Sequence, residues 1–261
     1  MNSEMTLADY ALKVANAKKN HTKFVILDGS TSVGRDRKYS DYDVMIVTKG
    51  RRDAIPQTKE IYGVFNGRLF IGSVQSLESL KEYWFSNGDK EDIWRIQQIR
   101  KAKLLCGDEK EFRRIKKFAL QKRWNKKREF AIIRHSYSNM VEYLGKLLNK
   151  RNEENAPEFY QDAYIIASQI ASFITAINRI NLDSDNTMYR QIFKEAKIRP
   201  PNFERDFLIL SGFSQRTREK ENIIRTAKRI IEWARKYAES EYRNFPLNDF
   251  GFREIVQQLK F

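Results

Sequence analysis

The sequence predicts an α+β protein, with a small mixed β-sheet and its helices in about residues 1–120 and an all-α helical bundle in residues 121–261. Two observations predict this order. Short apolar runs typical of strands occur only up to residue 76, whereas later stretches have the apolar spacing of amphipathic helices. The 261 residues are enough to bury a sizeable core, either as one large domain or as two ordinary ones.

The first expected helix covers residues 1–20, where apolar positions recur among charged ones. Two strands follow. The runs "FVIL" (24–27) and "VMIV" (44–47) are continuously apolar, which is typical of strands covered on both faces. The segment "EIYGVFNGRLFIGSV" (60–74) predicts two more strands, because its central Asn66-Gly67 favours a tight hairpin in which both residues take positive φ. No further strand is expected.

The remaining elements are expected to be helices. Helical spacing covers three segments before the bundle, which are 77–85, 90–105 and 109–124. From about Phe130 the chain is predicted to be helical to near its end, with a last helix over 217–244. Turn-forming residues interrupt this region at four places, 152–160, 179–186, 197–203 and 211–217. These interruptions predict a bundle of several helices.

Two aspartates stand one residue apart at the start of the second apolar run. Because side chains alternate along a strand, Asp41 and Asp43 are expected to face the same side, a few ångströms apart. Like charges held so close repel each other unless a cation lies between them, and Mg²⁺ or Mn²⁺ takes carboxylate ligands while keeping positions open for water and phosphates. The alternative is a pair of turn-capping aspartates that face solvent.

A Gly-Ser turn ends the first apolar run. Gly29 and Ser30 are followed by "TSVG" (31–34), and residues this small let backbone N–H groups approach an anion. If the first two strands pair, phosphates held at this turn would lie beside a metal held by Asp41 and Asp43. The two features together therefore favour the metal site over the turn-capping alternative.

An apolar strand, Gly-Ser, about ten residues and Asp-x-Asp on the next strand resemble the signature of the DNA polymerase beta-like nucleotidyltransferase superfamily. The segment "FVILDGSTSVGRDRKYSDYDVMIV" (24–47) matches this signature throughout. Within the superfamily, "EYLGK" (142–146) is similar to the Glu-Tyr-x-Gly-Lys segment of the aminoglycoside (kanamycin) nucleotidyltransferases. The spacing of Glu142 and Lys146 on a helix is, taken alone, equally that of a surface ion pair.

The resemblance implies transfer of a nucleoside monophosphate from a nucleoside triphosphate to an acceptor hydroxyl, with release of pyrophosphate and dependence on Mg²⁺ or Mn²⁺. It assigns Glu142 as the general base and Asp41 and Asp43 as metal ligands. The nucleotide would be bound by four residues, which are Gly29, Ser30, Arg35 and Lys146. It also implies a homodimer in which the helical domain of one subunit completes the active site of its partner.

The sequence departs from this family at one catalytic position. Relatives usually carry a third carboxylate on the strand after the hairpin, where this chain has Phe70 or Ile71. The strong positive charge also argues against a polycationic aminoglycoside as the acceptor, so the acceptor is left open. The alternative function is a catalytically lapsed member of the fold that binds nucleic acid or acts as an interaction, antitoxin-like module.

The composition sets outer limits on the function. The formal net charge is +15, and residues 95–134 are dense in Lys and Arg, which indicates either a solvated helical face or a surface for nucleic acid. A single cysteine, Cys106, excludes an internal disulfide and favours a cytoplasmic location. No apolar run has the length of a membrane span, and the first residues lack the apolar core of a signal peptide, so no membrane partner is expected.

Overall fold

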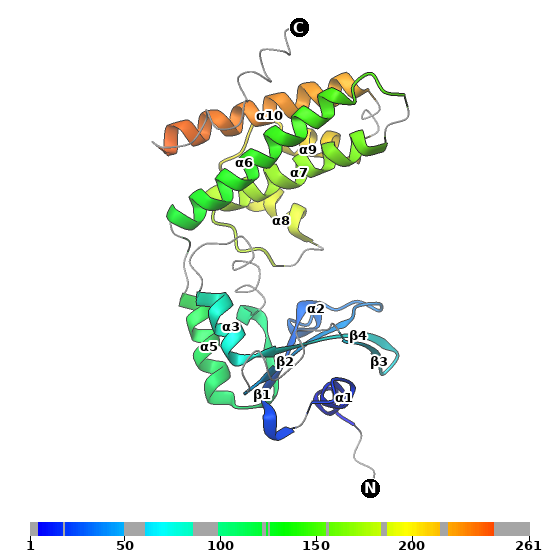
Figure 1. Ribbon diagram of the computed structural model, residues 1–261, viewed down its shortest axis with the longest axis vertical. Helices are drawn as coiled ribbons and strands as arrows, with labels where there is room; N and C mark the ends of the chain where they lie inside the picture. Colours follow the sequence, from blue (N-terminus) through cyan, green and yellow to red (C-terminus); the bar gives the residue numbers. More distant parts are fainter. Residues whose placement is uncertain are drawn as a thin grey trace. The chain divides into compact units, whose positions relative to one another are not determined.

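The structure is a computed structural model that describes residues 5–17, 19–49, 61–85, 99–121, 124, 126–154, 157–183, 187–214 and 219–242. The chain divides into two compact units, Met1–Arg123 and Trp124–Phe261. Among the described residues, every strand lies in the first unit, and the second unit is helical (Figure 1). The predicted α+β class is confirmed.

The first unit is built on a five-stranded mixed sheet with the strand order β3-β4-β2-β1-β5. Its strands are β1 (Thr22–Asp28), β2 (Tyr42–Thr48), β3 (Ile61–Phe65), β4 (Arg68–Ser76) and β5 (Lys103–Gly107). Strands β2 and β4 run parallel, and the other neighbouring pairs are antiparallel. The two apolar runs that the sequence singled out therefore lie side by side in the middle of the sheet.

The hairpin between β3 and β4 has the predicted turn. Asn66 and Gly67 have φ values of 48° and 75°, so both lie in the left-handed region that this kind of two-residue turn requires. The hairpin places β3 at one edge of the sheet and β4 directly against β2. The position where relatives carry a third acid is thereby brought beside the start of β2.

One predicted helix is wrong at its end. Residues 90–105 were expected to be helical, but Lys103–Gly107 form β5, which pairs antiparallel with β1 through Ile26 and Leu104. Residues 99–101 are helical, and the preceding part of the prediction lies outside the described residues. A short run such as "KLLCG" has no decisive period, and its strand conformation satisfies backbone groups on the open side of β1.

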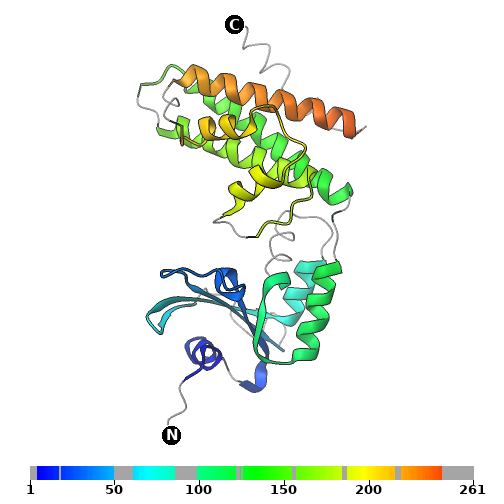
Figure 2. The same ribbon diagram turned by 180° about the vertical axis from the view of Figure 1, so that it is seen from behind.

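Helices cover both faces of the sheet (Figure 1, Figure 2). On one face lies α1 (Leu7–Val14), shorter than the predicted helix over 1–20. Its apolar side packs on alternate residues of the central strands, which are Val25, Leu27, Val44, Ile46 and Phe70. On the other face, α3 (Leu77–Phe85) and α5 (Glu109–Gln121) accompany a second core that contains Phe24, Ile26, Met45, Val47, Leu80, Phe112 and Ile115.

The second unit is a helical bundle, as predicted. Its helices are α6 (Lys126–Asn149), α7 (Pro157–Ile177), α8 (Met188–Glu195), α9 (Phe203–Leu210) and α10 (Lys220–Glu241). The apolar stripe of α6 is fully buried at five positions, which are Ile133, Tyr137, Met140, Leu144 and Leu147. Within the described ranges, no helix combines the length and apolar character that crossing a membrane requires.

Candidate active site

The strand pairing gathers carboxylates at one end of the sheet. In the antiparallel register of β1 and β2, Asp28 lies directly opposite Asp43, and Asp41 comes just before β2 begins. Asp28 and Asp43 are in step along their strands with Ile26 and Met45, so their side chains belong to the sheet face that carries α3 and α5. The expected pairing of the first two strands is confirmed, and it brings a third carboxylate beside the predicted two.

Sequence reasoning missed Asp28. Its signal was present, because an acid at the end of a buried apolar run, directly before Gly29-Ser30, is an expensive residue to place there. Only the register of β1 against β2 shows that this acid faces Asp43 rather than solvent. That register is a long-range property, which the spacing of residues within either segment does not specify.

Gly29 makes room for the carboxylate of Asp43. Its φ is +67°, and a Cβ atom at this position would lie 2.2 Å from Asp43 Oδ2. A side chain here would therefore meet both backbone strain and a direct clash. Gly29 also begins α2 (Gly29–Ser32), a single helical turn in which the Ser32 hydroxyl donates to the Gly29 carbonyl oxygen at 2.8 Å. The predicted Gly-Ser turn is thus in contact with the predicted metal ligand.

The electrostatics of the cluster disfavour three negative charges. Burial, together with the nearby charges of Asp41 and Asp28, raises the pKa of Asp43 from 3.8 to about 6. Burial also raises the pKa of Asp28, although the backbone N–H of Gly29 and the charge of Lys101 partly oppose this shift. No ion pair within the described residues neutralises Asp43. The charge of Lys101 acts on Asp28, whereas Asp43 has no such partner in the part of the chain that the structure describes.

The strand after the hairpin supplies no acid. In the parallel register of β2 and β4, Ile71 lies beside Asp43, and Phe70 is buried in the core on the α1 face. In the described part of the chain, no three His, Cys, Asp or Glu side chains are close enough to hold one metal ion. Asp41 and Asp43 could therefore offer at most two carboxylates, a number that suffices for Mg²⁺ when water and substrate phosphates complete the coordination.

The other predicted residues lie in two places. Ser30 and Arg35 belong to the first unit, where the Arg35 backbone N–H donates to the Ser30 carbonyl oxygen at 3.0 Å. Glu142 and Lys146 lie on α6 in the second unit and form an ion pair of 2.7 Å. Their side chains are 58% and 41% exposed, and the pairing raises the pKa of Lys146. In the first unit, Asp41 and Asp43 lie close to the Gly-Ser turn. In the second unit, Glu142 and Lys146 lie together on α6.

The basic stretch over residues 95–134 is interleaved with acids where it is described. On α5, Arg113 pairs with Glu109 at 2.6 Å and Arg114 pairs with Glu111 at 2.7 Å. Lys116 donates to the Ala102 carbonyl oxygen at 2.8 Å. These partners are typical of a solvated helical face. Residues 95–98, 122, 123 and 125 lie outside the described ranges, and a nucleic-acid surface stays a prediction.

Comparison with known proteins shows a similarity of fold. No family model matches the sequence, and no curated protein matches it. Among solved structures, the chain is similar to a nucleotidyltransferase-like protein from Exiguobacterium sibiricum 255-15, with a TM-score of 0.51 and 8% identity. The similarity covers 97% of this chain and 84% of that one. The chain has a nucleotidyltransferase-like fold. At this identity the likeness concerns the fold alone, and the resemblance to kanamycin nucleotidyltransferases stays a prediction from the sequence motifs.

Proposed function

We propose that the protein is a metal-dependent nucleotidyltransferase that moves a nucleoside monophosphate from a nucleoside triphosphate to an acceptor hydroxyl. One observation carries this proposal. Asp43 is a partly buried carboxylate that lies opposite Asp28, near Asp41, and against a glycine whose missing side chain leaves it space. A fold gains nothing in stability from such a cluster, but a divalent cation and a triphosphate would use it.

In the proposed site, Asp41 and Asp43 hold Mg²⁺ or Mn²⁺. When bound, the ion would neutralise charge on the transferring and departing phosphates. Gly29 and Ser30 would hold the triphosphate tail through backbone N–H groups and the Ser30 hydroxyl, with Arg35 as a further cation. In the reaction, the acceptor oxygen attacks the α-phosphorus, and the bond from that phosphorus to the bridging oxygen breaks. Pyrophosphate leaves with the bonding electron pair.

The second unit would supply the proton acceptor and a phosphate contact. By the sequence resemblance, Glu142 takes the proton of the attacking hydroxyl, and Lys146 contacts a phosphate of the nucleotide. The same resemblance implies a homodimer in which these residues serve the active site of the partner subunit. The ion pair of Glu142 with Lys146 supports this role only in part, because surface pairs on other helices have the same geometry.

The change Glu142→Gln tests the enzymatic proposal. Pyrophosphate release from nucleoside triphosphates, screened against a panel of acceptor hydroxyls with Mg²⁺ or Mn²⁺, should slow by about 10²- to 10⁴-fold, the usual contribution of a positioned base. Affinity for the triphosphate should be nearly unchanged, because Asp41, Asp43 and the Gly-Ser turn hold the donor. A lapsed enzyme would instead bind the triphosphate and release no pyrophosphate in wild type either.

Glu109→Gln is a matched control. Glu109 pairs with Arg113 four residues later at 2.6 Å and is 61% exposed, so it copies the local geometry of Glu142 away from the proposed chemistry. Both changes should cost under about 1 kcal/mol of stability. If the two variants have equal activity, Glu142 is an ordinary surface residue.

Mixing two inactive chains tests the proposed dimer. A heterodimer of a Glu142→Gln chain and an Asp41→Asn chain has one site with both groups intact if these residues meet across subunits. Purified heterodimer should then recover about half of the wild-type activity, and a random mixture about a quarter. No recovery in a verified heterodimer would place Glu142 and Asp41 in the same subunit's site, or remove Glu142 from the mechanism.

A further inference from the structure

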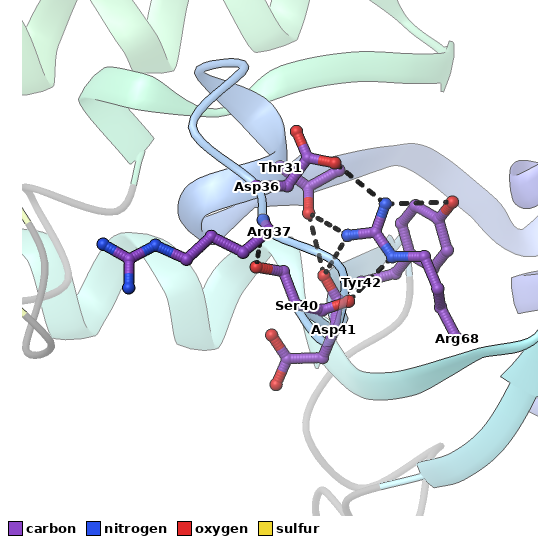
Figure 3. Close-up of polar contacts among 7 residues, drawn as sticks. All are labelled: Thr31, Asp36, Arg37, Ser40, Asp41, Tyr42 and Arg68. Carbon is purple, nitrogen blue, oxygen red and sulfur yellow. Dashed lines mark hydrogen bonds and ion pairs between the residues drawn. The ribbon is translucent and has the colours of Figure 1, made fainter.

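The first residue of β4, Arg68, directs its whole guanidinium group at the loop between the Gly-Ser turn and β2 (Figure 3). An arginine side chain has five N–H donors, and all five have acceptors here. Nε donates to the Ser40 carbonyl oxygen at 2.7 Å. Nη1 donates to Asp36 Oδ2 at 3.0 Å and to Tyr42 Oη at 3.5 Å, and Nη2 donates to Thr31 Oγ1 at 3.0 Å and to the Asp41 carbonyl oxygen at 3.4 Å.

Two further contacts fix the guanidinium within this network. Its central carbon lies 4.2 Å from the centre of the Tyr42 ring, a cation–π arrangement. The Thr31 hydroxyl, which accepts from Arg68, donates in turn to the Asp41 carbonyl oxygen at 2.8 Å. Thr31 belongs to the Gly-Ser turn, and Asp41 is a proposed metal ligand. One side chain therefore ties the turn proposed to hold phosphates to the residue proposed to hold the metal.

The network holds the backbone of Asp41 and leaves its carboxylate outside. In Figure 3 the carboxylate of Asp41 points away from the Arg68 guanidinium, which faces the Asp41 carbonyl oxygen. An arginine that bonded the carboxylate would compete with a cation for it. Because its five donors are all engaged, Arg68 also has no N–H left to bind a phosphate. Arg68 therefore holds other groups of the site in place.

The hydrogen bonds within the exposed part of this loop join residues close together in sequence. Residues 33–39 are exposed. The backbone N–H groups of residues 33–35 donate to the carbonyl oxygens of Ser30 and Thr31, and Arg37 and Ser40 exchange hydrogen bonds of 2.8 and 2.9 Å. An exposed loop of this length samples many conformations unless specific contacts order it. The side chain of Arg68, only 20% exposed, is the part of the sheet that reaches across to do so.

We propose that Arg68 is a positioning residue of the nucleotidyltransferase site, which orders the loop over residues 31–42 so that the Asp41 carboxylate is presented to the metal. This inference rests on the proposed function. Residues that orient metal ligands without touching the metal typically change metal affinity by about 10- to 100-fold when they are replaced. The effect should reach the metal through Asp41, because the carboxylate that accepts from Arg68 is that of Asp36 in the loop and belongs to none of the three cluster acids.

This role can be tested without any activity, by measuring the Mn²⁺ affinity of the full chain. Titration calorimetry below the unfolding temperature gives that affinity. Arg68→Gln removes a positive charge near a cation site, so through-space electrostatics alone would tighten Mn²⁺ binding. Positioning predicts the opposite sign, a weakening of about 10- to 100-fold. Arg68→Lys keeps the charge but cannot reproduce the planar fork of donors, and should weaken binding about 10-fold.

Two more variants complete the experiment. Thr31→Val removes the hydroxyl that links Arg68 to Asp41 without changing any charge, and it should weaken Mn²⁺ binding in the same direction. Arg235→Lys is the matched control, because Arg235 is 21% exposed and bonds Glu232 and Glu239 in the second unit. It should lower thermal stability and leave Mn²⁺ affinity unchanged. If Arg68 had only a structural role, its variants would likewise have lower thermal stability and unchanged Mn²⁺ affinity.

The outcomes separate this inference from the proposed function. If Asp41→Asn and Asp43→Asn weaken Mn²⁺ binding but the Arg68 variants bind like wild type or tighter, Arg68 is no positioning residue and the metal site stands. If the two aspartate variants also bind like wild type, the metal site is wrong and both proposals fall. Should Arg68→Gln fail to fold, Arg68→Lys and Thr31→Val decide the question.

Discussion

The two units of this chain treat their buried carboxylates differently. In the helical unit, Asp206 is fully buried and is paired with Arg229 at 2.7 Å. Glu129 is buried and paired with Arg179 at 2.9 Å, and Asp162 is buried and paired with Lys150 at 2.7 Å. In the sheet unit, Asp43 faces Asp28 with no cation paired to it among the described residues. The paired acids of the helical unit are those expected when stability is the requirement, whereas the placement of Asp43 indicates a requirement other than stability.

A buried acid is costly without a counter-charge, and a chain can supply that counter-charge easily. The helical unit supplies it from arginine and lysine side chains at three separate places. The whole chain carries 49 Lys and Arg residues, so cations are not scarce. In the described part of the chain none of them pairs with Asp43, which agrees with the proposal that a metal ion serves as its counter-charge.

The largest effect is expected in the helical unit. Arg229→Met removes the main partner of Asp206 and leaves a buried carboxylate whose remaining ion pair, among the described residues, is with Arg205. The unit should lose about 3 kcal/mol of stability, the lower end of the cost of breaking a buried pair. Hydrogen exchange of peptides from α9 and α10, followed by mass spectrometry, measures this loss locally.

Arg205→Met is the control for that change. Arg205 contacts the same carboxylate at 3.3 Å, but its side chain is 62% exposed, so its removal should cost under about 1 kcal/mol. Equal losses for the two arginines would show that Asp206 needs no particular partner, and the contrast between the units would weaken.

An intermediate effect is expected when Mg²⁺ or Mn²⁺ is added. A ligand that binds only the folded state stabilises it by about 2.7 kcal/mol at one hundred times its dissociation constant. Protection from hydrogen exchange should rise in β1, β2 and the Gly-Ser turn, whereas peptides of α9 and α10 should not change. The same titration of Asp41→Asn should give little protection. Uniform protection of both units would indicate ion binding without a site.

The smallest effect is the pH dependence of the metal-free protein. Because the pKa of Asp43 is raised from 3.8 to about 6, the folded state binds the proton more tightly than the unfolded state. The resulting stabilisation is complete below about pH 4 and is lost as the pH rises towards 6. After allowance for solvent screening at this partly exposed group, the loss amounts to about 1 kcal/mol.

Asp43→Asn should remove this loss and make the metal-free protein about 1 kcal/mol more stable than wild type at pH 7 in EDTA. Denaturant unfolding at several pH values measures both quantities. Asp108→Asn is a control of opposite sign, since Lys23 lowers the pKa of Asp108, and this variant should keep the wild-type fall between pH 4 and 6. A stability of Asp43→Asn below that of wild type at pH 7 would mean that the charge of Asp43 already has a partner.

Local sequence patterns predicted those structural features that are determined by residues close together in the sequence. The hairpin at Asn66-Gly67, the two central strands and the ion pair of Glu142 with Lys146 all follow from spacing or turn chemistry within a few residues. The motif also indicated the pair of aspartates and their Gly-Ser turn. Their catalytic roles remain predictions.

What the sequence did not show depends on contacts between distant segments. Asp28 gains its meaning from the register of β1 on β2, and Arg68 acts on acceptors between residues 31 and 42. The strand β5 was mistaken for the end of a helix because only pairing with β1 makes a strand of so short a run. Such contacts are set by tertiary packing, which a single sequence encodes only indirectly.

The pairing of β5 with β1 also determines when the first unit can fold during synthesis. Strand β1 is made early, but its second neighbour is complete only when Gly107 has been added, after α3 and the intervening chain. Until then, one edge of β1 presents unpaired backbone N–H and C=O groups, which are a template for association with other chains. Contacts this far apart in sequence form slowly. A nascent chain that stalls before Lys103 should therefore be the form of this protein that most needs a chaperone.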